Sequence, residues 1–199
     1  MKLHEKAVLR FRNEESSHKI LSTSYDNTVC LATVSSEGVI DVENRYYFRY
    51  TCDAICFCPK HKSILIAERN QPYLNYISMD TQERTEVPIN HIGSDQHVSF
   101  CITDIQLMHD EEYVVTLTDK GMIVIYKYGE NTHIQEIHGG SRLSDSYYNG
   151  CIAIDDREKN IISICADNGI RVYSMYSGKE VKCLTGHTKT VRMNDCSNR

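Results

Sequence analysis

One unit recurs four times along this chain of 199 residues, and the repeat constrains the fold more than any other feature. Each copy consists of two apolar, strand-like runs joined by a short polar turn. The first runs of the four copies begin at Ile20, Ile64, Val114 and Ile161, so successive copies are 44, 50 and 47 residues apart. A repeat of this length is typical of stacked or radially arranged units that bury one another's apolar faces. Such architectures more often form binding platforms than active sites.

Each unit contains four short runs that read as β-strands, bounded by turn-forming residues. The expected strands are 7–11, 19–25, 28–34 and 39–42; then 54–58, 63–67, 73–79 and 84–89; then 102–108, 113–118, 122–128 and 133–137; and finally 151–154, 160–165, 170–175 and 180–184. The inner hairpins turn at Asp, Asn and Gly residues, which tolerate positive φ or cap their own backbone. The central runs are apolar on both faces, as in strands that lie between neighbouring sheets. Because helix signals are nearly absent, the sequence predicts an all-β protein.

Composition limits the function classes. The net charge of −5 and the pI near 6.0 argue against a general nucleic-acid binder, which usually carries a basic face. No apolar run approaches the roughly 20 residues that cross a bilayer, and the start of the chain lacks the apolar stretch of a secretory signal. The nine cysteines are odd in number and dispersed, which favours reduced thiols in a reducing compartment. We therefore expect a cytoplasmic or nuclear protein without membrane insertion.

At the end of the fourth unit, the segment 178–192 reads GKEVKCLTGHTKTVR, with a Gly-His pair at Gly186 and His187. This segment resembles the WD-repeat family. In that family this pair lies between the outer strand of one blade and the inner strand of the next. The resemblance implies a β-propeller of four-stranded antiparallel blades, in a single segment over 1–199. The blades would cover 4–45, 46–92, 97–139 and 147–186, with 187–199 starting a fifth.

Four blades are fewer than the seven or so with which WD-repeat propellers usually close. The resemblance therefore implies a partial or open propeller. We expect the chain to be a fragment, a truncated product, or part of a ring that another chain completes. An unpaired sheet edge would otherwise invite association.

The resemblance also assigns structural residues. His4 lies 22 residues before Asp26, and Ser24 lies two before it, which matches the family's buried His–Ser–Asp hydrogen-bond network; His187 would be the corresponding histidine at the end of the fourth unit. The family's tryptophan at the end of the third strand is Ala32 in the first unit. The other units carry a tyrosine there, at Tyr76, Tyr126 and Tyr173. Tyrosine keeps a large apolar body and one polar tip, which fits a chain with 13 Tyr and no Trp.

Two chemical alternatives compete with these structural roles. Cys52, Cys56, Cys58 and His61 offer four zinc ligands, but they are compressed into ten residues instead of forming two separated pairs. Ser24 could form a hydrolytic triad with Asp26 and with His4 or His187, but it lies mid-strand without a Gly-rich elbow. We therefore predict packing thiols and a structural polar network, with no metal, no cofactor and no enzymatic activity.

The function that follows is a non-enzymatic scaffold or adaptor that binds other proteins through a propeller surface, within a multi-subunit complex. No small-molecule substrate is expected. Arg192, beside His187, is a candidate partner-binding residue because it lies at an inner-strand entrance. The alternative is an RNA-associated or assembly-complex subunit, whose binding would depend strongly on salt.

Overall fold

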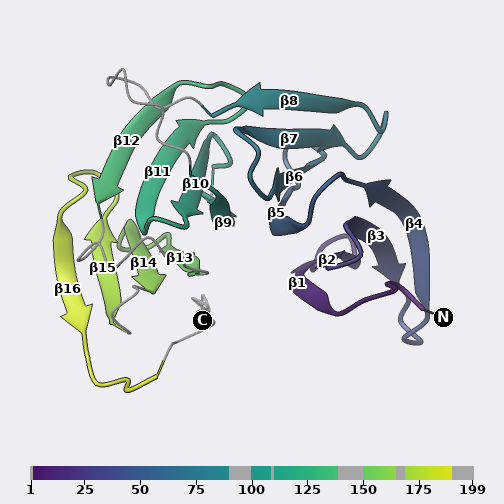
Figure 1. Cartoon of the computed structure of the whole chain (residues 1–199), viewed down its shortest axis with the longest axis horizontal. Helices are drawn as coiled ribbons and strands as arrows, with labels where there is room; N and C mark the ends of the chain where they lie inside the picture. The colour runs from purple at the N-terminus through teal and green to yellow at the C-terminus, as the bar shows by residue number, and fades with distance from the viewer. Residues whose placement is uncertain (1, 90–99, 109, 139–149, 165–168, 190–199) are drawn as a thin grey trace. The chain divides into compact units, whose positions relative to one another are not determined.

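The computed structural model describes residues 2–89, 100–108, 110–138, 150–164 and 169–189 (Figure 1). These residues form sixteen strands and no helix, so the part described contains no helix that could cross a membrane. The strands are β1 (Val8–Glu14), β2 (Lys19–Ser24), β3 (Thr28–Val34), β4 (Ile40–Tyr47), β5 (Cys52–Cys58), β6 (Ser63–Glu68), β7 (Tyr73–Ser78), β8 (Arg84–Pro88), β9 (Ile102–Leu107), β10 (Tyr113–Thr118), β11 (Met122–Lys127), β12 (His133–His138), β13 (Ile152–Asp155), β14 (Asn160–Ile164), β15 (Ile170–Ser174) and β16 (Glu180–Leu184). The protein is all-β over these residues, as predicted.

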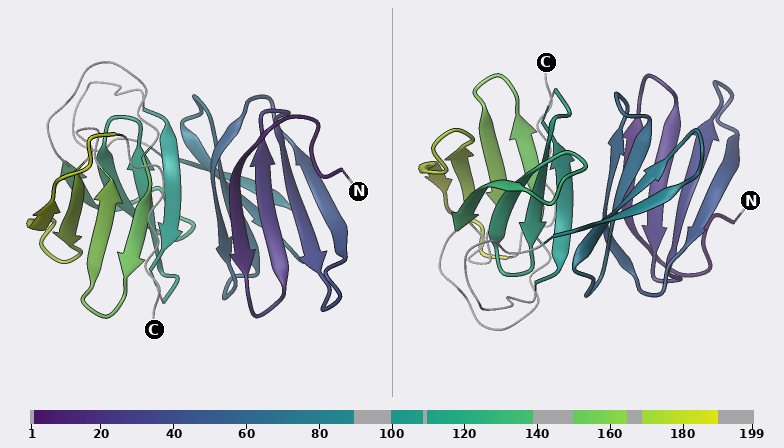
Figure 2. Two further views of the ribbon diagram at one scale, coloured as in Figure 1. Left: turned by 90° about the horizontal axis from the view of Figure 1, so that it is seen from below. Right: turned by 90° about the horizontal axis from the view of Figure 1, so that it is seen from above.

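Consecutive strands pair into four antiparallel sheets of four strands each, in the orders β1-β2-β3-β4, β5-β6-β7-β8, β9-β10-β11-β12 and β13-β14-β15-β16. Figure 2 shows the up-and-down course of the strands within each sheet. No strand ladder joins one sheet to another among the described residues. Each predicted sequence unit therefore forms one four-stranded sheet.

Turn geometry repeats with the sheets. The hairpin between the first and second strands places a residue with positive φ at His18, Lys62, Glu111 and Lys159. The hairpin between the third and fourth strands does the same at Gly38, Gln82, Gly129 and Gly178. Left-handed backbone of this kind lets a short loop follow the twist of the strands that it joins.

The chain divides into two compact units, Met1–Ile89 and Asn90–Arg199. The first unit holds the first two sheets. One face of each contributes to a shared apolar core, formed by Leu21, Val29, Leu31, Cys52, Ile55, Phe57, Ile64, Ile66 and Ile77. These side chains come from β2, β3, β5, β6 and β7, so the core fastens the first sheet to the second.

The second unit holds the other two sheets and has an equivalent core of Val115, Leu117, Ile123, Ile125, Ile137, Ile152, Ile161, Tyr173 and Met175. Asp104, in β9, is only 1% exposed, and its carboxylate bridges the two sheets of this unit. Its Oδ2 accepts a hydrogen bond from the Ile152 N–H at 3.0 Å, and its Oδ1 accepts one from the Ile105 N–H at 3.0 Å.

Most strand bounds lie within two residues of the expected ranges; β1 ends at Glu14 instead of 11, and the largest difference is in β4. β4 extends from Ile40 to Tyr47, whereas the expected strand was 39–42. The extension consists of residues 43–47, and it pairs with β3 up to Tyr47 opposite Thr28. The aromatic residues at its end are thus brought beside the β2–β3 turn.

Candidate interaction surface of the first unit

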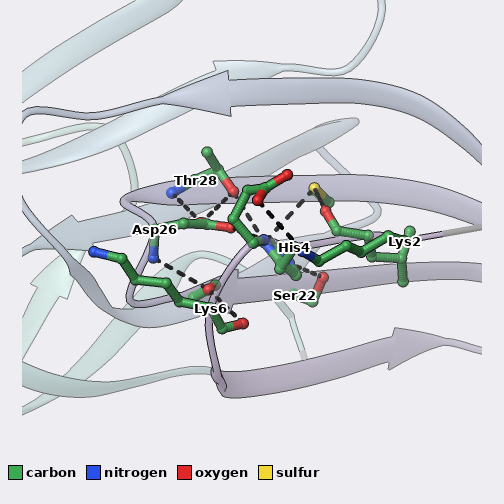
Figure 3. Close-up of polar contacts among 10 residues, drawn as sticks. Lys2, His4, Lys6, Ser22, Asp26 and Thr28 are labelled. Carbon is green, nitrogen blue, oxygen red and sulfur yellow. Dashed lines mark hydrogen bonds and ion pairs between the residues drawn. The ribbon is translucent and has the colours of Figure 1, made fainter.

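His4 lies in a closed polar network on the first sheet (Figure 3). Its Nδ1 is 2.9 Å from Thr28 Oγ1 and 3.3 Å from Asp26 Oδ2, and its Nε2 is 2.8 Å from Ser22 Oγ. The Thr28 hydroxyl donates its only hydrogen to Asp26 Oδ1 at 2.6 Å. Nδ1 of His4 must therefore carry a hydrogen and donate it.

Asp26 organises this network from the β2–β3 turn. Its Oδ1 also accepts the Thr28 N–H at 3.0 Å, a local bond that shapes the turn, and its Oδ2 accepts the Glu5 N–H at 2.6 Å. Burial alone would raise the pKa of this carboxyl. The hydrogen bonds from Thr28 and Glu5 and the charge of His4 outweigh burial, so the pKa of Asp26 lies well below its ordinary value.

The hydrogen bonds of the His4 ring go to residues other than those assigned to this network. The Ser24 hydroxyl donates to the Lys6 carbonyl at 3.1 Å and accepts from the Asp26 N–H at 3.2 Å, while Ser22 takes the place beside His4. His187 is exposed after β16. Arg192 lies outside the described residues.

The four third strands place one residue at a common position. Ala32, Tyr76, Tyr126 and Tyr173 are all buried, with 1%, 8%, 3% and 3% exposure. In three of the four sheets a β-bulge in the pairing with the fourth strand falls immediately before this residue, at Ala32, Tyr126 and Tyr173. A bulge re-aims the side chain beside it, so Ala32, Tyr126 and Tyr173 share this backbone feature, whereas the β7–β8 pairing around Tyr76 is regular.

The groups that could support chemistry are dispersed. Cys52, Cys56 and Cys58 are buried free thiols, and burial raises the pKa of Cys52 far above its ordinary value. The described residues contain no group of three His, Cys, Asp or Glu side chains placed to hold a metal ion. In the His4 network the His4 and Asp26 side chains are 2% and 7% exposed. Because its polar atoms bond one another, the network fastens residues 3–6 to the sheet.

The feature best placed to contact another molecule is the link between the first two sheets, residues 47–51, which we call the connector. The first sheet holds it through Asn27. The Asn27 carbonyl accepts the Phe48 N–H at 3.0 Å, and the Asn27 side chain donates to the Arg49 carbonyl at 3.4 Å and accepts from the Thr51 hydroxyl at 3.0 Å. Asn27 has a φ of 62°, a conformation that asparagine tolerates better than most residues.

The second sheet holds the connector as well. Glu68, which is 4% exposed at the end of β6, accepts the Tyr50 N–H at 2.5 Å. The Arg69 N–H donates to the Thr51 carbonyl at 2.8 Å. The Arg84 guanidinium lies over the Phe48 ring, 4.8 Å from its centroid, and donates to the buried Asn75 amide at 2.7 Å. Phe48 therefore points inward, against the second sheet.

The remaining connector side chains point outward. Tyr47 is 74% exposed and Tyr50 is 37% exposed, and Arg49 between them is exposed with its guanidinium 5.3 Å from the Tyr50 ring centroid. Tyr25, in the adjoining β2–β3 turn, is 47% exposed. Tyrosine and arginine are the residues most enriched where proteins bind one another. The connector thus presents such side chains from a backbone that is held at both ends.

Sequence reasoning did not select these residues. The sequence feature that could have indicated them is the run RYYFRY at 45–50, the densest aromatic and basic stretch of the chain. The expected strands were 39–42 and 54–58, so the residues between them were assigned to no element. Which of the aromatic residues face outward depends on contacts with Asn27, Glu68 and Arg84, all distant in the sequence.

No model of a known protein family matches this sequence, and no curated protein is significantly similar to it.

Proposed function

We propose that the chain is a WD-repeat-like propeller segment that acts as a non-enzymatic scaffold and binds other proteins through the connector of its first unit. Four sheets with one strand order and recurrent positive-φ turns support a propeller-type repeat. The Gly-His pair at Gly186 and His187 supports the WD-repeat relationship.

The observation that carries the proposal is the combination of exposure and restraint in residues 47–51. Exposed tyrosines on a mobile loop would lose conformational freedom on binding, which weakens affinity. Here the backbone is already held by Asn27 on one side and Glu68 on the other. Binding side chains on a rigid support is the arrangement that favours recognition.

The test is selection of displayed peptides on the full, folded chain, followed by measurement of affinity for the selected sequences. We expect Tyr47→Ala and Tyr50→Ala each to weaken binding by about tenfold, since buried aromatic anchors commonly contribute more than ~1 kcal/mol. Tyr176→Ala is the matched control, because Tyr176 is 81% exposed in the β15–β16 turn of the second unit. Its affinity should stay within about twofold of the unchanged protein.

Thermal melting of each variant separates loss of binding from loss of folding. The proposal is wrong if the selected peptides bind the connector variants as tightly as the unchanged chain. It is also wrong if the selection yields no binding sequence.

A further inference from the structure

We infer that the connector recognises an acidic segment of a partner protein, with carboxylates paired to Arg49 and Lys6 and apolar side chains packed on Tyr47 and Tyr50. This inference rests on the proposed function and specifies the chemistry of the partner.

The charged side chains around the connector and the β2–β3 turn support an acidic partner. The carboxylates here, those of Glu5, Asp26, Asp53, Glu68 and Glu86, each lie within 3.9 Å of a basic side chain. Three of them are also buried: the Asp26, Asp53 and Glu68 side chains are 7%, 5% and 3% exposed. Each of these carboxylates therefore already has a basic neighbour, with Arg84 serving both Glu68 and Glu86.

Lys6 and Arg49 are different. Both are exposed, and neither has a carboxylate partner within the described part of the chain. The surface thus offers two cationic side chains that no carboxylate engages, although the whole protein carries a net charge of −5. An acidic partner would be attracted by these two cations and repelled by the negative charge on the rest of the protein. Charge would therefore help to direct it to this surface.

The geometry of Arg49 suits carboxylate binding. Its guanidinium already lies against the Tyr50 ring at 5.3 Å, and its carbonyl is held by Asn27. Stacking of this kind limits the freedom of the side chain without using its hydrogen-bond donors. A planar guanidinium can then donate two parallel hydrogen bonds to one carboxylate. Tyr47 and Tyr50 add hydroxyl donors and apolar ring surface.

The experiment uses the full chain and three labelled peptides that share the same leucines and differ only in having Glu, Gln or Lys at the remaining positions. We expect the Glu peptide to bind about tenfold more tightly than the Gln peptide, as charge-assisted hydrogen bonds are roughly twice as strong as neutral ones. Raising the salt from about 50 mM to about 300 mM should reduce that preference, because screening weakens exposed charge pairs. The Lys peptide should bind most weakly.

Arg49→Glu should abolish the preference for the Glu peptide. Lys182→Glu, on exposed β16 of the second unit, changes the net charge by the same amount and should preserve the preference. If the Gln peptide binds as well as the Glu peptide and still requires Tyr47, the acidic partner is wrong and the scaffold proposal survives. If a uridine oligonucleotide binds more tightly than every peptide and requires Arg49, the site recognises phosphate and the inference is overturned. If no probe requires the connector, both proposals fail.

Discussion

The Thr51 hydroxyl donates a 3.0 Å hydrogen bond to the side-chain amide of Asn27, a residue 24 positions earlier in the chain. This bond joins the β2–β3 turn of the first sheet to the start of the second. Together with the Asn27 contacts to Phe48 and Arg49, it makes one asparagine the main support of the connector on that side. The exposed tyrosines and Arg49 depend on this support for their position.

Replacing Asn27 should therefore loosen the connector. Asn27→Gly keeps the positive φ but removes the side-chain contacts, and we expect a loss of about 1 kcal/mol in the free energy of unfolding. Asn27→Ala should cost about 1 kcal/mol more, because a Cβ is unfavourable in left-handed backbone. Amide hydrogen exchange should become faster at residues 48–51 in both variants. Unchanged exchange there would show that the connector is held without Asn27.

Asp26 should make stability depend on pH. Its pKa is lower in the folded protein than in the unfolded chain, so the ionised form stabilises the fold. That contribution is complete above the unfolded pKa of about 4 and is lost as the pH falls towards the folded value. Asp26→Asn should lower the free energy of unfolding by about 1–3 kcal/mol at pH 7.

Urea unfolding of both proteins between about pH 7 and pH 3 measures this effect. The difference between them should be constant above about pH 5 and should shrink at lower pH. A difference that stays the same across the whole range would mean that the charge of Asp26 is not responsible.

Asp104 should hold the two sheets of the second unit together. Its carboxylate accepts N–H donors from Ile105 and Ile152, and Asp104→Asn turns one acceptor oxygen into a donor that faces another donor. A buried group left without its partner costs about 1–3 kcal/mol. We expect a loss of that size, with faster hydrogen exchange at the Ile152 amide. Asp80→Asn is the control, since Asp80 is 61% exposed in a surface ion pair and should change stability by less than about 1 kcal/mol.

Replacing Gly178 by alanine should destabilise the fold more than replacing Gly38 by alanine. Both have positive φ, 65° and 79°, so alanine at either site costs about 1–2 kcal/mol in backbone conformation. At Gly178 a Cβ would also lie 2.5 Å from the end of the Gln135 side-chain amide, whereas nothing lies within 4 Å at Gly38. With its amide oriented to donate to the Met175 carbonyl at 2.6 Å and accept from the Gly178 N–H at 2.8 Å, Gln135 joins β12 to the β15–β16 turn.

Moving the Gln135 side chain would break those two bonds, so Gly178→Ala should cost about 1 kcal/mol more than Gly38→Ala in urea unfolding. In a Gln135→Ala background the extra cost should disappear, because the obstructing group is gone. If Gly178→Ala lowers the free energy of unfolding by the same amount in the Gln135→Ala background as in the unchanged protein, the penalty comes from the backbone conformation alone.

Local patterns in the sequence determined the repeat, the all-β class and nearly every strand. Three strands, Thr28–Val34, Tyr113–Thr118 and Glu180–Leu184, have the bounds expected for them. This was possible because strand formation depends on short-range alternation and on turn residues that lie next to each other in the chain. His4 and Asp26 were also expected together, because their spacing of 22 residues resembles that of the WD-repeat network, and His4 Nδ1 lies 3.3 Å from Asp26 Oδ2.

Tertiary contacts decided the rest. Ser22 and Thr28, rather than Ser24, contact His4, because the faces of β2 and β3 determine which hydroxyl points towards it. Likewise, nothing local distinguishes Phe48 from Tyr47. Phe48 is turned inward by Arg84, 36 residues later, and Tyr47 is left exposed. The sequence by itself determined where strands and turns form, whereas only the packing of two sheets decided which side chains remained exposed.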